Sequence, residues 1–107
     1  MTRWSKVAIS ALWVCGAAAA SAAEEPQPSP LQLRSWAAAC AACHGTGGVA
    51  LPGMPTLAGV PAEVLLQKLL DFKTGKTPAA TLMPQLTKGY SDVQLQALAG
   101  YFATPAK

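Results

Sequence analysis

The stretch Cys40-Ala41-Ala42-Cys43-His44 decides how this chain is interpreted. Upstream of it, apolar residues recur at the three- and four-residue spacing of a buried helix face: Leu33, Trp36, Ala37 and Cys40. Ser29 has the residue type of a helix N-cap, and Pro30 suits the first helical position. We therefore predict a helix from about Pro30 to Ala42, with Cys40 on its buried face.

The residues after this stretch predict a second helix between two loops. Residues 45–60 contain five glycines and two prolines, a composition typical of a loop. The second helix is predicted to begin at Pro61 and to end at Gly75. Its apolar face holds Leu65, Leu66, Leu69, Leu70 and Phe72. Residues 76–90, which include Met83, predict another loop.

A last helix is predicted to start at Ser91, where Ser91 and Gln94 have the spacing of a capping box. Three of its residues are expected in the core: Leu95, Leu98 and Phe102. No alternation of apolar and polar residues is long enough for a strand, and no internal repeat is present. The expected fold is therefore a single all-α domain.

The first 23 residues have the layout of an export signal. Arg3 and Lys6 precede an apolar run from Val7 to Ala20, and small residues follow it. The alternative is an uncleaved membrane anchor, but this run of 14 residues is shorter than the roughly 20 needed to cross a bilayer. We expect cleavage before Glu24 and a periplasmic protein without stable membrane insertion.

The expected mature chain has 84 residues, which are the 107 residues less the 23 of residues 1–23. Residues 24–30 would be a flexible, proline-rich lead-in, and residues 31–107 the domain. Removing Arg3 and Lys6 leaves six basic and five acidic residues, 6 − 5 = +1. Such a weak and scattered charge does not indicate a nucleic-acid partner. A domain of this size is usually marginal without a cofactor, metal or disulfide.

The motif predicts a covalently attached haem. Two thiols three residues apart at a helix end can each bond one haem vinyl group, and the imidazole of His44 is then held beside the iron. The mature chain has Cys40 and Cys43 as its cysteines and His44 as its histidine, which is enough for one haem c.

The motif has three other possible interpretations. A thioredoxin-like dithiol needs a βαβ pattern that the sequence lacks. A structural zinc site normally has four Cys or His ligands, and the mature chain offers three. A disulfide between Cys40 and Cys43 would constrain little of the chain. The sequence therefore favours haem c.

Two methionines are candidates for the second axial ligand. Met54 follows His44 by ten residues and Met83 follows it by 39. A chain of either length can reach around the ring, so spacing leaves both residues open, together with an empty sixth position.

Four stretches resemble class I cytochromes c: Cys40–Gly45, Pro55–Gly59, Met83–Pro84 and Leu98–Phe102. The resemblance extends over residues 31–103. It implies the small all-α class I cytochrome c fold, with three main helices around one covalent haem and with the first and last helices crossing.

The same resemblance implies roles for individual residues. The carbonyl of Pro55 would accept a hydrogen bond from the imidazole of His44, and Leu57 would pack on the ring in the haem pocket. Met54 would then lie on the histidine side, so the second axial ligand would be Met83. Ligation by His44 and Met83 favours electron transfer over catalysis.

The runs Asp71–Gly75 and Leu82–Ser91 further resemble the cytochrome subunit of flavocytochrome c sulfide dehydrogenase. That resemblance implies a non-catalytic haem subunit, which accepts electrons from an FAD-containing, sulfide-oxidising flavoprotein and passes them to a downstream cytochrome or oxidase. Many such subunits carry two haem domains, whereas this chain has one Cys-x-x-Cys-His. The alternatives are a free monohaem carrier feeding a terminal oxidase, and a peroxidase-like or gas-binding haem protein if Met83 does not bind the iron.

Overall fold

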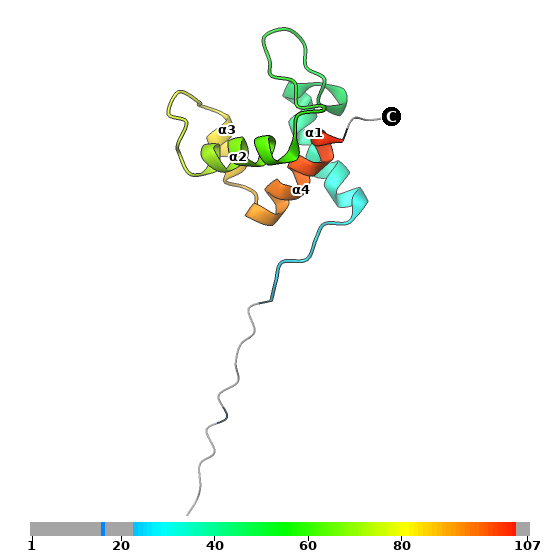
Figure 1. Cartoon of the computed structure of the whole chain (residues 1–107), viewed down its shortest axis with the longest axis vertical. Coiled ribbons are helices and arrows are strands. Elements are labelled where there is room, and N and C mark those ends of the chain that lie inside the picture. Colours follow the sequence, from blue (N-terminus) through cyan, green and yellow to red (C-terminus); the bar gives the residue numbers. More distant parts are fainter. Residues whose placement is uncertain (1–15, 17–22, 105–107) are drawn as a thin grey trace, which may run out of the picture.

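The computed structural model describes Gly16 and residues 23–104 (Figure 1). Most of the predicted leader, residues 1–23, lies outside the described residues, as do residues 105–107. The elements are α1 (Pro30–His44), the 3₁₀ turn η1 (Thr46–Gly48), α2 (Ala62–Lys73), α3 (Met83–Thr87) and α4 (Asp92–Ala103). The described part contains no strand, which confirms the prediction of an all-α fold.

Helix α1 begins and ends at local sequence signals. The Ser29 hydroxyl accepts a hydrogen bond from the backbone N–H of Gln32 at 3.2 Å, which confirms the predicted N-cap. The helix continues two residues beyond the predicted end, through His44. It ends there because Gly45 adopts a φ of +85°, and a Cβ at that position would collide with the carbonyl of Val49.

Helix α4 has the predicted capping box at its start. Ser91 Oγ accepts from the N–H of Gln94 at 3.2 Å, and Gln94 Oε1 accepts from the N–H of Ser91 at 2.9 Å. Lys73 at the end of α2 forms an ion pair with Asp92 at the start of α4, with an N–O distance of 2.7 Å. This pair lies where the two helices meet.

The apolar core lies where α4 packs against α1 and α2 (Figure 1). Its buried side chains are Ala37, Leu65, Leu98, Ala99 and Phe102. Leu95 is also buried, so all three predicted core residues of the last helix are confirmed. The core is small, which agrees with the expectation that a bound group must contribute to the stability of this domain.

The prediction of one continuous loop over residues 76–90 was wrong. Residues Met83–Thr87 form α3, a single helical turn that packs against α2. Leu82, at the N-cap position of α3, supplies no side-chain hydrogen bond, and Pro84 in the first turn is the local residue that suits a helix start. Helix α3 forms because Thr87 bonds back to the Met83 carbonyl and because α2 supports it.

Candidate haem site

The two cysteines lie on the last turns of α1. Cys40 is half-buried and packs against the core, and Cys43 is exposed. Both thiols are free. Burial raises the pKa of the Cys40 thiol. The last turns of the helix therefore carry two free thiols, four residues and one residue before His44.

His44 is the last residue of α1 and is buried, with 8% of its surface exposed. Its Nδ1 lies 2.7 Å from the carbonyl oxygen of Pro55. Because a carbonyl can only accept, Nδ1 donates this hydrogen bond, and in a neutral imidazole the free lone pair is then on Nε2. A histidine held in this tautomer has the form that binds a metal through Nε2.

The loop that carries Pro55 is tied to η1 and to α4. The Gly48 carbonyl accepts hydrogen bonds from the N–H groups of Leu57 and Ala58 at 2.8 and 3.1 Å. The Gly59 N–H donates to the carbonyl of Phe102 at 3.0 Å. Leu57 is half-buried and packs against the core. These contacts hold the Pro55 carbonyl where it meets the imidazole.

The two methionines have different surroundings. Met83 is half-buried at the first position of α3. Met54 is 43% exposed and directly precedes Pro55. The carbonyl of Pro55, the residue that follows Met54, contacts Nδ1 of His44.

An aromatic pair lies beside Cys40. The rings of Trp36 and Tyr90 meet edge to face, with centroids 6.2 Å apart and planes at 69°. Burial raises the pKa of Tyr90, and the charge of an ionised Cys40 raises it further. Both aromatic side chains are half-buried and pack against the core. Through this pair, the loop before α4, which contains Tyr90, contacts α1 one turn before Cys40.

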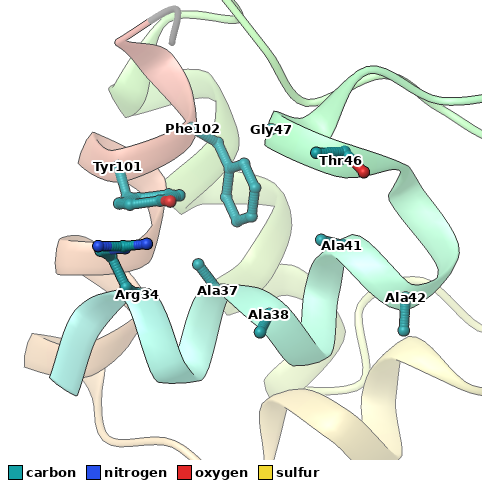
Figure 2. Close-up of a pocket in the computed structure, with 9 residues that line it drawn as sticks. All are labelled: Arg34, Ala37, Ala38, Ala41, Ala42, Thr46, Gly47, Tyr101 and Phe102. Carbon is teal, nitrogen blue, oxygen red and sulfur yellow. The ribbon is translucent and has the colours of Figure 1, made fainter. Parts of the chain in front are cut away.

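A pocket of about 430 Å³ lies between α1, η1 and the end of α4, and Figure 2 shows the residues that line it. Arg34 and four alanines of α1 line it, together with Thr46, Gly47, Tyr101 and Phe102. Two of these alanines, Ala41 and Ala42, lie between Cys40 and Cys43, so the pocket adjoins the thiol segment.

The residues present fit an attached haem c. Two free thiols stand at the required spacing, and the next residue is a buried imidazole whose Nδ1 is held by the Pro55 carbonyl. Within residues 23–104, no group of three or more His, Cys, Asp or Glu side chains gathers in a metal-binding arrangement. None of the described helices has the length and apolarity needed to span a membrane.

A small all-helical domain with this thiol and imidazole arrangement defines a c-type cytochrome. A family profile described as "Cytochrome C oxidase, cbb3-type, subunit III" matches residues 33–102. The chain belongs to this family of cytochrome c domains. Its cofactor is therefore one covalent haem c, and cytochrome c domains of this family serve in electron transfer.

Three relatives illustrate the family. The "Cytochrome subunit of sulfide dehydrogenase" of Chlorobaculum tepidum is 35% identical over 68 residues, which cover 64% of this chain and 61% of that protein. The "Thiosulfate dehydrogenase electron acceptor" of Thiomonas intermedia is 42% identical over 77 residues, covering 64% and 35%. "Cytochrome c-554(547)" of Halothiobacillus neapolitanus is 31% identical over 77 residues, covering 63% and 85%. The chain thus spans less than two thirds of the first two relatives.

Sequence reasoning missed Thr87. Its side chain is 2% exposed and its hydroxyl bonds to the carbonyl of Met83 at 2.9 Å. Since Thr-Lys-Gly-Tyr has the composition of an exposed turn, the sequence contains no signal for this burial.

Proposed function

We propose that Cys40 and Cys43 form the two thioether bonds to haem c, and that His44 and Met83 are the axial ligands of its iron. The hydrogen bond between His44 and Pro55 is the single observation that carries this proposal. It orients the ring and leaves Nε2 available.

The same hydrogen bond supports Met83 over Met54. Pro55, the neighbour of Met54, contacts Nδ1 of His44, which is the nitrogen that would not bind the iron. Met83 is half-buried on a separate element, at the first position of α3, and would supply the second ligand from there. Leu57, held by its backbone bond to Gly48, is proposed to pack against the haem on the histidine side.

These ligands favour electron transfer. Haem c supplies a one-electron Fe(III)/Fe(II) couple when it is bound. The imidazole of His44 and the thioether of Met83 would occupy both axial positions, so no position would remain for oxygen or peroxide. A peroxidase-like or gas-binding function would require Met83 to be displaced.

Two substitutions test the axial assignment. In the ferric haem-loaded protein, Met83→Ala is expected to abolish the weak long-wavelength band of an iron–methionine bond, and Met54→Ala to leave it unchanged. A band that survives in Met83→Ala and disappears in Met54→Ala would contradict the assignment. A band missing from the unaltered protein would favour the open-site alternative.

We further infer that the chain is a haem subunit that accepts electrons from a sulfide-oxidising, FAD-containing flavoprotein and passes them to a downstream cytochrome or oxidase. The relative from Chlorobaculum tepidum supports this inference, because its name assigns it to sulfide dehydrogenase. The runs Asp71–Gly75 and Leu82–Ser91 carry the same resemblance.

A second candidate is a freely diffusing carrier that delivers electrons to a terminal oxidase. Two relatives named as thiosulfate dehydrogenase electron acceptors favour it, at 42% and 37% identity. Their names describe acceptors of electrons rather than subunits of the dehydrogenase.

Purification of the native protein from its own host separates the two candidates. A co-purifying flavin-containing chain, with reduction of the haem on addition of sulfide, is expected for the subunit. A haem chain that elutes alone, and is reduced only when a thiosulfate dehydrogenase and thiosulfate are added, would support the carrier and contradict the subunit.

The proposed place of action is the periplasm. The basic residues Arg3 and Lys6, the apolar run 7–20 and the small residues before Glu24 support export and cleavage. The mass of the purified holoprotein is expected to equal residues 24–107 plus one haem. Retention of residues 1–23 would favour a membrane anchor.

A further inference from the structure

Thr87 is a buried polar residue that the proposed ligand set does not use. Only 2% of its surface is exposed, and the other buried polar residue among the described residues is His44. Burial of a hydroxyl is unfavourable unless the group finds a partner. Thr87 Oγ1 donates to the carbonyl of Met83 at 2.9 Å, and it lies 3.4 Å from the carbonyl of Pro84.

Helix α3 has little support of its own. It contains five residues, which is far shorter than the about 12 residues at which isolated helices begin to be stable. Leu82 supplies no side-chain cap, although Pro84 in the first turn suits a helix start. Besides the backbone bonds to the Leu82 carbonyl, the Thr87 hydroxyl supplies the side-chain bond that ties the last residue of this short turn to its first.

Thr87 also connects this turn with the helix that carries the cysteines. Its carbonyl accepts a hydrogen bond from the N–H of Tyr90 at 3.2 Å. The Tyr90 ring packs edge to face on Trp36 of α1, one helical turn before Cys40. A contact path thus runs from Met83 through Thr87 and Tyr90 to α1.

We propose that Thr87 is a positioning residue that holds Met83 on the haem iron by fixing the Met83 backbone through its hydroxyl. The inference rests on the proposed role of Met83 as axial ligand. Without the hydroxyl bond, α3 keeps its packing on α2, but the first residue of the turn loses a restraint, so the thioether leaves the iron more often.

Two substitutions separate the hydroxyl from the volume of the side chain. Thr87→Val keeps the shape and removes the donor, whereas Thr87→Ser keeps the donor and removes a methyl group. If Thr87 only fills space, Ser should be the more harmful change. If Thr87 positions Met83, Thr87→Val should weaken the bond between Met83 and the iron, whereas Thr87→Ser should leave that bond as it is in the unaltered protein.

Thr74→Val provides a matched control. Thr74 Oγ1 donates to the carbonyl of Leu70 at 2.8 Å, which is the same bond to a carbonyl four residues earlier. It lies at the exposed end of α2 and has no bond to α3. Its loss should not affect Met83.

The measurement is the rate at which imidazole replaces Met83 in the ferric holoprotein at saturating imidazole. Loss of one hydrogen bond predicts a rate about two- to tenfold higher in Thr87→Val. Thr87→Ser and Thr74→Val are expected to match the unaltered protein. Equal rates in Thr87→Val and the unaltered protein, or acceleration in Thr87→Ser alone, would overturn the proposal.

Failure of this inference is distinguishable from failure of the ligand assignment. If Met54 is the ligand in place of Met83, Met83→Ala will leave the long-wavelength band of the ferric protein intact, and if neither methionine binds the iron, the unaltered protein will lack the band. If Met83 is the ligand and Thr87 does not position it, that band will vanish in Met83→Ala while imidazole replaces Met83 at the same rate in Thr87→Val and the unaltered protein. Absorbance of the haem under denaturing conditions checks that every variant carries the same amount of cofactor.

Discussion

Gly48 offers a sharp test of how the loop that carries Pro55 is held. Its φ is +82°, and a Cβ built there would lie 2.8 Å from Phe102 Cδ1, 3.0 Å from the Ala58 nitrogen and 3.2 Å from Leu57 Cβ. The change to alanine therefore adds backbone strain and steric overlap at the same position.

The two effects can be given approximate sizes. A left-handed backbone costs a non-glycine residue about 1–2 kcal/mol. Overpacking a filled site costs about 1–3 kcal/mol more. Because the close atoms include a backbone nitrogen, they cannot simply rotate away. Gly48→Ala is therefore expected to lower the free energy of unfolding by about 2–5 kcal/mol.

Two other glycines provide controls. Gly53 has a φ of +97° and no atom within 4 Å of a built Cβ, so Gly53→Ala should show the strain alone, about 1–2 kcal/mol. Gly100 lies within α4 and also has open space around it. Gly100→Ala should therefore stabilise the protein by about 0.5–1 kcal/mol.

Urea unfolding of the haem-loaded proteins, followed by far-ultraviolet circular dichroism, gives these free energies. The expected order of stability is Gly100→Ala, then the unaltered protein, then Gly53→Ala, and Gly48→Ala last. If Gly48→Ala and Gly53→Ala agreed to within about 0.5 kcal/mol, the close packing around Gly48 would be refuted.

Three further predictions concern the core, a cap and the charge. Leu98→Ala, at a side chain that is 2% exposed, should cost about 2–5 kcal/mol in urea unfolding, whereas Leu31→Ala, at 76% exposed, should stay within about 0.5 kcal/mol; equal losses would contradict the assigned core. Ser91→Ala removes the bond to the Gln94 N–H and should cost about 1 kcal/mol, which Ser91→Asp should largely recover. Finally, with a net charge of +1 in the expected mature chain, the second-order rate of electron transfer should change little with ionic strength in stopped-flow measurements, and a steep fall with added salt would contradict this expectation.

Predictions that depended on neighbours in sequence were confirmed. Ser29 caps α1, and Ser91 forms its capping box with Gln94, because a cap joins groups only three residues apart. The apolar spacing of α4 placed Leu95 and Leu98 in the core correctly. Such features need only the local helix geometry, which the residue pattern contains.

Features that depend on distant partners could not be predicted from residue patterns alone. Helix α3 was missed because the interactions that stabilise it come from α2 and from a buried Thr87 hydroxyl. The bond between His44 and Pro55 joins residues eleven positions apart, and it was expected only from the resemblance to cytochromes c. The roles of Met83 and Leu57 in binding haem stay predictions.

The sequence by itself determined the class of cofactor and the helical fold, because two thiols and an imidazole at fixed spacing define an attachment site without reference to the rest of the chain. Only the tertiary structure decided which ring nitrogen of His44 meets the carbonyl of Pro55. It also revealed the turn that presents Met83. These features depend on where separate segments meet, and that is settled by packing around a small shared core.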